Sequence, residues 1–158
     1  MREQMSAGLN TLTGGPGIEY AVDSTGKVSG DNAIKLIKIA QKYGAVKAIV
    51  SYGGFLGLNP DWDFKAVAAG LKEFEEKNQL PPTYINSYDE PNTEAEKTAV
   101  LKGLVGGTAA GLKTIGWTSW HADGDELWNK ILTNSYAPAL NSHDAENIRQ
   151  VKALGRHP

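Results

Sequence analysis

Two adjacent carboxylates, Asp89 and Glu90, stand at the end of a predicted strand that begins at Tyr84, and a proline follows them directly. Thr93 and Glu96 then have the spacing of a capping box, so a helix is predicted to begin there. Active sites of α/β proteins are built where strands end and helices begin. The pair is therefore a candidate for proton transfer on a small polar substrate.

Other side chains suited to binding a sugar follow neighbouring predicted strands. Aromatic rings stack on the apolar faces of sugar rings, and tyrosine and histidine form hydrogen bonds with hydroxyl groups. Trp117 and Trp120 are expected on opposite faces of their strand, and Trp120 is nearer its end. The candidate substrate-binding residues are Tyr52, Tyr88, Trp117, Trp120, His121 and His143.

Each of these residues also has a structural interpretation. An aspartate before a proline segment is common in turns, a glutamate beside it is then simply solvated, and the tryptophans can pack between sheet and helices. Asp123 and Asp144 have the position of helix N-caps. Strand alternation points Asp89 and Glu90 to opposite faces, so both reach one pocket only if the strand ends or bulges between them.

Strands and helices alternate through the whole chain. Such alternation predicts parallel strands joined by right-handed crossovers. Strands are predicted at 9–13, 45–52, 84–90, 114–120 and 137–141, and helices at 31–43, 64–78, 93–110, 123–134 and 144–154, with 18–30 as a long loop.

Two architectures fit about five parallel β/α units: an incomplete (β/α)8 (TIM) barrel and an open doubly wound parallel sheet. The first is favoured because the strands are short, evenly spaced and followed by glycine, tryptophan, histidine or carboxylate residues. No GxGxxG or phosphate-binding loop follows a strand, which weighs against nucleotide binding. A complete barrel needs roughly 250 residues. We therefore expect one partial barrel domain over residues 1–158, truncated at both ends.

Composition restricts the class of protein further. The formal net charge is −2 and no basic patch is present, so nucleic acid is not an expected partner. The chain has no cysteine, which excludes disulfides and thiolate metal sites. No cofactor, metal site or membrane span is predicted. A secreted or periplasmic location would require a signal peptide upstream, and the sequence leaves location and oligomeric state open.

The segment Tyr88-Asp89-Glu90-Pro91 resembles the end of the fourth strand in glycoside hydrolase barrels. In the large retaining clan this strand ends Asn-Glu-Pro, with Glu as general acid/base, and Asp89 replaces that Asn here. An adjacent Asp-Glu pair is typical of substrate-assisted N-acetylhexosaminidases, and one family of N-acetylgalactosaminidases has Asp-Glu-Pro. The stretches 7–11 and 52–54 are also similar to such barrels, which would make the five strands numbers two to six.

This resemblance implies a fragment of a glycosidase that cleaves O-glycosidic bonds, with 2-acetamido sugars among its expected substrates. Glu90 would protonate the glycosidic oxygen and later activate water, which requires a raised pKa of its carboxyl. Asp89 would orient a 2-acetamido group for attack on the anomeric carbon. In the retaining clan, a carboxylate on a seventh strand, which this chain lacks, would be the nucleophile instead.

Two other functions fit the same residues. One is a metal-dependent barrel enzyme of the sugar isomerase or lyase type, with Glu90, His121, His143 and Asp144 as oxygen and nitrogen ligands. The other is a non-catalytic carbohydrate-binding fragment. Metal content would separate the first of these from a glycosidase.

Overall fold

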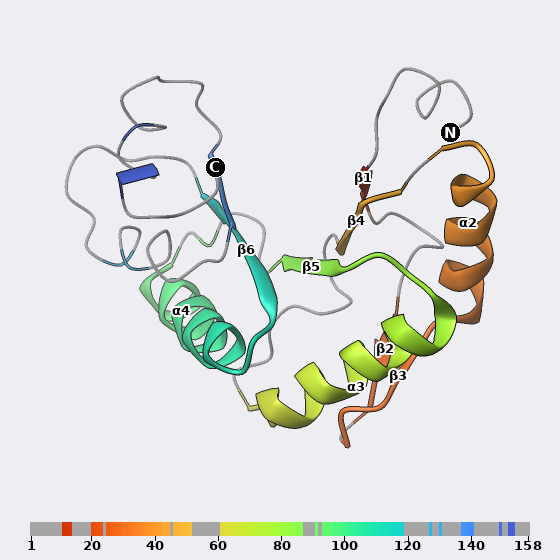
Figure 1. The fold of residues 1–158 in the computed structure, drawn as a ribbon. Coiled ribbons are helices and arrows are strands. Elements are labelled where there is room, and N and C mark those ends of the chain that lie inside the picture. The colour runs from red at the N-terminus through yellow and green to blue at the C-terminus, as the bar shows by residue number, and fades with distance from the viewer. Residues whose placement is uncertain are drawn as a thin grey trace.

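The centre of the fold is a five-stranded parallel sheet with the strand order β1-β4-β5-β6-β7 (Figure 1). The computed structural model describes residues 11–13, 20–23, 25–44, 46–51, 61–86, 91, 93–118, 127, 130, 137–140, 149, 152 and 153. The five predicted parallel strands are confirmed. Their bounds are β1 (Thr11–Thr13), β4 (Ala48–Ser51), β5 (Thr83–Asn86), β6 (Lys113–Thr118) and β7 (Ala137–Leu140).

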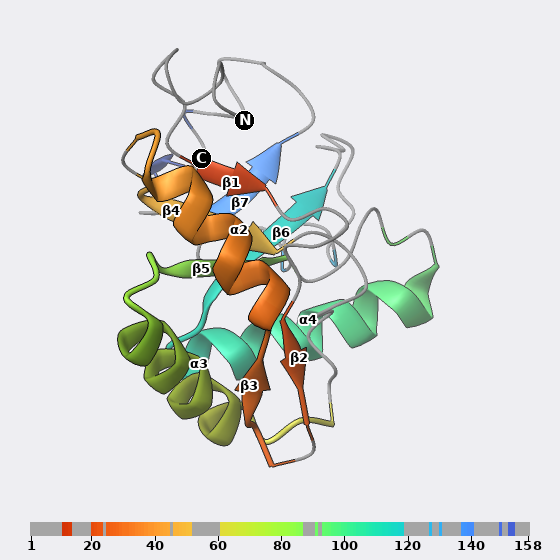
Figure 2. The same cartoon turned by 90° about the vertical axis from the view of Figure 1, so that its right-hand side faces the viewer.

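Helices α2 (Asp31–Gln41), α3 (Phe64–Asn78) and α4 (Glu94–Ala109) cover the outer side of the curved sheet (Figures 1 and 2). The spatial order of the strands is the same as their order in the chain. A doubly wound sheet instead reverses its strand order at a switch point and carries helices on both faces. The described elements therefore have a TIM-barrel-like arrangement, in which the sheet is an open arc.

Helix α3 shows how the sequence sets an element's bounds. Oδ1 of Asp63 accepts hydrogen bonds from the backbone N–H groups of Lys65, at 3.1 Å, and Ala66, at 3.2 Å, which caps the first turn. The apolar residues of this helix recur at helical spacing and face the core. The helix ends at Asn78, as predicted, because Gln79 adopts a left-handed conformation with φ 53°.

Helix α4 begins with the predicted capping box. The backbone N–H of Glu96 donates to Thr93 Oγ1 at 3.2 Å, and the backbone N–H of Thr93 donates to Glu96 Oε2 at 2.9 Å. Two of the donors that a helix start leaves without intrahelical partners are thus satisfied. The start of α4 is therefore fixed at Thr93.

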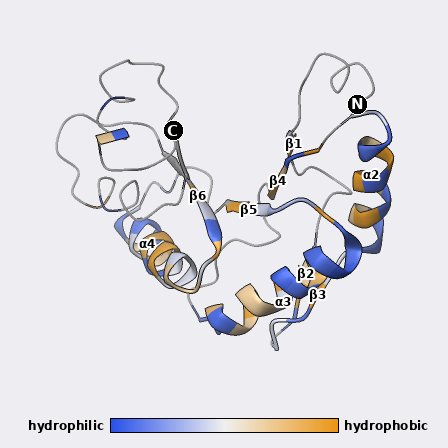
Figure 3. Cartoon of the chain, in the orientation of Figure 1, coloured by the Kyte–Doolittle hydropathy of each residue, from blue (hydrophilic) through white to orange (hydrophobic). Residues whose placement is uncertain are grey.

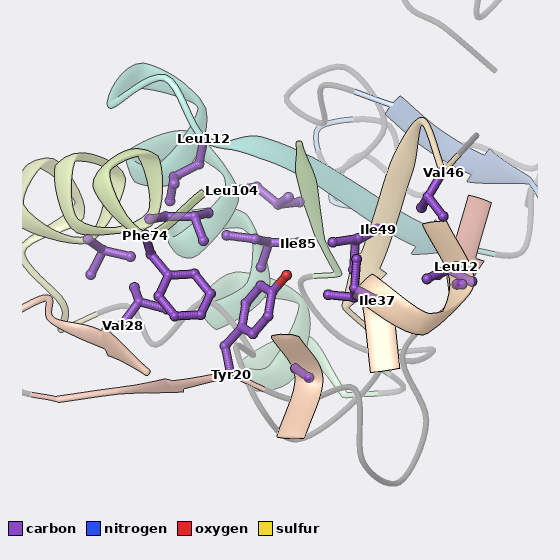
Figure 4. Packing of buried hydrophobic residues seen from close by; sticks show 14 of the residues in the cluster. Leu12, Tyr20, Val28, Ile37, Val46, Ile49, Phe74, Ile85, Leu104 and Leu112 are labelled. Atoms are coloured by element: carbon purple, nitrogen blue, oxygen red, sulfur yellow. The ribbon is translucent and has the colours of Figure 1, made fainter. Parts of the chain in front are cut away.

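The hydrophobic core lies between the sheet and the helices. Figure 4 shows Ile49 and Ile85 of the sheet packed near Ile37 of α2 and Leu104 of α4, all at most 1% exposed. Figure 3 shows the mixture of hydrophobic and hydrophilic residues along the helices that is expected where one face packs on a core. This packing holds the strands and their flanking helices in one arrangement.

The prediction of a loop at 18–30 is wrong in one respect. This segment contains a short antiparallel hairpin, formed by β2 (Ala21–Val22) and β3 (Val28–Ser29). Asp23 organises the turn: its Oδ1 accepts from Thr25 N at 2.8 Å and from Lys27 N at 3.1 Å. Strands of two residues are too short to show an alternating pattern, so periodicity missed them. The turn chemistry around Asp23 was the available signal.

The last two predicted helices, 123–134 and 144–154, lie largely outside the described residues. Within them, residues 127, 130, 149, 152 and 153 are helical. Among the described residues, no helix combines the length and apolar character needed to cross a membrane.

Candidate active site

The parallel strands bring their carboxyl ends to one edge of the sheet. Strand β5 ends at Asn86 at this edge, and α4 begins just after Thr93, so residues 87–92 connect the two. Asp89 and Glu90 belong to that connection but lie outside the described residues. So do the other side chains proposed for substrate or metal, which are Tyr52, Tyr88, Trp120, His121, His143 and Asp144. The roles assigned to these residues stay predictions.

The backbone of Trp117 is described in β6, where it pairs with Ala139 of β7. Asn86, the last residue of β5, pairs with Ile115. Trp117 therefore lies two residues farther along, toward the edge at which the chain enters the Asp89–Glu90 connection. Its side chain is outside the described part, so the register supports its placement at this edge and leaves its contact with substrate as a prediction.

Helix α4 is held firmly behind this edge. Pro91, directly after Glu90, is less than 2% exposed. The hydroxyls of Thr108 and Thr114 lie 2.8 Å apart and join the end of α4 to β6. Gly106 packs so closely on the ring of Phe64 that a Cβ at this position would overlap it. Buried Pro91 before the helix, and the contacts of Gly106 and Thr108 near its end, therefore fix the position of α4.

The first turn of α4 contains Lys97, which sequence reasoning missed. Lys97 is 8% exposed, and its Nζ lies 3.4 Å from Oε1 of Glu94. Lysine is seldom buried unless its charge is paired. The helical pattern gave no signal, because a lysine within a helix is normally read as part of the solvent-exposed face.

The opposite, amino edge of the sheet contains a polar cluster of Tyr20, Glu75 and Thr83. Oε1 of Glu75 accepts a hydrogen bond from the backbone N–H of Thr83, the first residue of β5, at 2.7 Å. The ring of Tyr20 packs edge-on against Phe74, with centroids 5.0 Å apart (Figure 4). In barrels, the amino edge contributes stability and the carboxyl edge contributes chemistry. This cluster is therefore a fold-stabilising anchor between α3 and β5.

Burial controls the titration of this cluster. Desolvation raises the pKa of the Tyr20 hydroxyl to about 12, and the Thr83 side chain opposes the shift in part. Desolvation also raises the pKa of the Glu75 carboxyl, while its Thr83 contacts and the charge of Lys113 act in the lowering direction. Burial therefore makes the ionised form of each group less favourable in the folded protein than in water.

Glu75→Gln and Glu75→Ala should have different effects on stability. The glutamine keeps an oxygen that accepts from Thr83 N and removes the cost of a half-buried charge, so we expect stability at pH 7 equal to or above that of the original chain. The alanine leaves Thr83 N without its acceptor and should destabilise by about 1–3 kcal/mol. Urea denaturation of both variants measures the difference.

The pH dependence of the same variants has a defined sign. Because the folded-state pKa of Glu75 is raised, the original chain loses stability as pH rises from the ordinary value of 4.5 through the folded-state value. Glu75→Gln should lack this loss, so its advantage should grow from pH 4 to pH 7. An advantage that shrinks over this interval would contradict the burial argument.

Two hollows occur in the described surface, and neither is lined by a predicted site residue. One, of about 710 Å³, lies between the β2–β3 hairpin and α3. The other, of about 430 Å³, includes Glu75, Thr83 and Lys113 and so belongs to the amino edge. The described residues also contain no group of three or more metal-binding side chains.

Comparison with solved structures identifies chitinases as similar in fold. The chain aligns with 51% of a chitinase from Chromobacterium violaceum over 91% of its own length, with a TM-score of 0.51 and 15% identity. For a chitinase from Bacteroides thetaiotaomicron the TM-score is 0.49 and the sequence identity is 12%, and the alignment covers 87% of this chain and 46% of that one. For a chitinase from Rhizomucor miehei the TM-score is 0.47 and the identity is 11%, with 87% of this chain and 52% of that one covered.

No protein-family model matches the sequence, and the comparison with curated proteins gives no match. The chain spans about half the length of the Chromobacterium chitinase. At 15% identity this likeness shows a shared fold, and it agrees with the strand order above. The described part of the chain therefore has a TIM-barrel-like α/β fold of the kind seen in a glycoside hydrolase, with the barrel not closed.

Proposed function

We propose that this chain is part of a glycoside hydrolase whose barrel is completed by strands outside residues 1–158, with Glu90 as the general acid/base. The observation that carries the proposal is the placement of the Asp89–Glu90 connection. It joins the carboxyl end of a central barrel strand, β5, to the capped start of α4. Active sites of TIM-barrel enzymes lie at this edge.

The proposed substrate is a 2-acetamido sugar. Asp89 replaces the asparagine of the retaining clan, and a carboxylate stabilises the positive charge of a forming oxazolinium better than an amide does. The likeness in fold to a chitinase supports the same substrate class, because chitin is a polymer of a 2-acetamido sugar. The six aromatic and histidine residues named from the sequence are proposed to line the sugar site.

In the proposed mechanism, Glu90 gives its proton to the glycosidic oxygen as the bond from that oxygen to the anomeric carbon breaks. The acetamido oxygen attacks the anomeric carbon and forms the oxazolinium, whose charge the Asp89 carboxylate stabilises. Glu90, now ionised, removes a proton from water, and this water opens the ring at the anomeric carbon. Protons balance because Glu90 ends as it began.

The test uses two matched glycosides, one with a 2-acetamido group and one with a 2-hydroxyl group. It requires the barrel-completed enzyme, meaning the chain together with its remaining strands. We expect hydrolysis of the acetamido sugar to be faster by about a hundredfold or more, since only this substrate carries its own nucleophile. Equal rates would show that the nucleophile is an enzyme side chain, and no hydrolysis of either would overturn the glycosidase assignment.

A further inference from the structure

Helix α2 carries an apolar stripe on its surface, formed by Leu36, Ile39 and Tyr43. These residues are separated by three and four positions, a spacing that places them on one side of a helix. Leu36 is partly buried, whereas Ile39 is 44% and Tyr43 51% exposed. In the described part of the chain, one other large apolar side chain is exposed, that of Val105 on α4. The exposed apolar surface is therefore concentrated on one side of α2.

The other sides of α2 have assigned roles. Its buried face packs on the core and consists of Ala33, Ile37 and Ala40. On one flank of this face, Lys38 Nζ and Gln41 Nε2 donate hydrogen bonds to the backbone carbonyl of Gln79 at the end of α3, at 3.2 and 3.4 Å. At about 3.6 residues per turn, the stripe lies on the opposite flank, with the buried face between the two. The stripe therefore faces away from α3.

That flank lies at the end of the described sheet. Figure 1 shows α2, α3 and α4 in succession along the outer side of the sheet, with α2 at one end of the row. Strand β1 is the first strand in the spatial order, and among the described strands it pairs with β4 alone. A (β/α)8 barrel continues past every strand with a further strand and helix. The flank with the stripe is therefore where the unit before β1 belongs in a complete barrel.

The charges beside the stripe specify the kind of helix that fits it. Lys35 and Lys42 are exposed and lie along the solvent side of the stripe. A helix packed on this flank needs its own apolar stripe, at the spacing of an amphipathic helix. Acidic residues at its rim would complement the two lysines. Single exposed apolar side chains are ordinary on protein surfaces, but a stripe at helical spacing beside the end of an open sheet is typical of an interface.

We propose that the stripe of Leu36, Ile39 and Tyr43 is the docking surface for the helix of the β/α unit that precedes β1 in the completed barrel. This helix is amphipathic and places acidic residues opposite Lys35 and Lys42. The inference rests on the proposed function, in which strands outside residues 1–158 complete the barrel. Its driving force is the removal of the apolar stripe from water.

Cysteine labelling tests the docking surface with little change to the fold. The chain has no cysteine, so Ile39→Cys introduces a single thiol whose reaction with iodoacetamide depends on its exposure. Mass spectrometry locates the label. We expect labelling in the barrel-completed enzyme to be slower than in residues 1–158 by at least about tenfold. Tyr43→Cys provides a second position if Ile39→Cys does not fold.

Val105→Cys is the matched control. Val105 is 46% exposed, close to Ile39, but it lies on α4, which joins β5 to β6 within the sheet. Its labelling rate should be the same in both proteins. Equal rates at Ile39→Cys in the two proteins would overturn the proposal. So would protection of Ile39→Cys in residues 1–158 that increases with protein concentration, because a second copy would then cover the stripe.

Lys35→Glu tests the charge of the docked helix. It should lower the urea midpoint of the barrel-completed enzyme more than that of residues 1–158, because it places like charges at the rim only when the helix is docked. Equal shifts in the two proteins would overturn the acidic rim.

Hydrolysis separates this proposal from the proposed function. Equal labelling rates in an enzyme that hydrolyses glycosides would remove only the docking surface. Protection of Ile39→Cys in a completed barrel without any hydrolysis would keep the docking surface and remove the glycosidase assignment.

Discussion

Glu90→Gln in the barrel-completed enzyme is expected to lower the hydrolysis of a 2-acetamido glycoside with a poor leaving group by about a hundredfold or more. Glutamine has nearly the same shape as glutamic acid but carries no proton that it can give to the glycosidic oxygen. The rate of hydrolysis of an activated aryl glycoside should fall much less, because its leaving group departs without protonation. Initial rates on the two substrates measure the difference.

Asp61→Asn is a suitable control for Glu90→Gln. Its side chain is 84% exposed and contacts Lys102 at 3.4 Å, so loss of this carboxylate should leave both rates nearly unchanged. If Glu90→Gln slowed both glycosides equally, Glu90 would not be the acid. The carboxylate would then contribute to substrate binding or to the fold.

Gly70→Ala is expected to destabilise the fold by about 1–3 kcal/mol, although alanine is normally the better helix former. Gly70 lies in α3 beneath the β2–β3 hairpin, and a Cβ at this position would overlap the backbone carbonyl of Gly26. Gly26 cannot easily move, because its φ is +82° and it closely approaches Ala66 of the same helix. The hairpin would therefore have to separate from α3.

Urea denaturation of residues 1–158 measures this effect as a lower midpoint with an unchanged slope. Lys72→Ala is the control in the same helix, since the Lys72 side chain is 76% exposed, and its effect should stay within about 0.5 kcal/mol. A Gly70→Ala variant as stable as the original chain would show that the hairpin does not depend on backbone contact with α3.

Helix caps and apolar spacing can be read directly from the sequence, and the elements that depend on them could be predicted. Apolar spacing placed α3 at its observed bounds, and Thr93 with Glu96 placed the start of α4. Alternation of strands and helices predicted the five parallel strands. These features need information from only a few neighbouring residues, because a helix cap or a period of 3.6 is set within one or two turns.

The strand order and the surroundings of each residue depend on contacts between distant segments. The sequence pattern fitted both a barrel and a doubly wound sheet, with the barrel favoured, and the order β1-β4-β5-β6-β7 agrees with a barrel-like sheet. The hairpin on α3 depends on the close approach of Gly26 and Gly70, which are far apart in the chain.

The sequence by itself determined which residues are candidates for the chemistry, because carboxylates, tryptophans and histidines are recognisable by type and by their place after predicted strands. Only the tertiary structure showed that β5 is a central strand of a barrel-like sheet and that Lys97 is buried at the start of the helix that follows Glu90. The physical reason is that burial and charge pairing are properties of packed neighbours. The fold decides which residues become neighbours, and the spacing of residues along one helix carries no information about them.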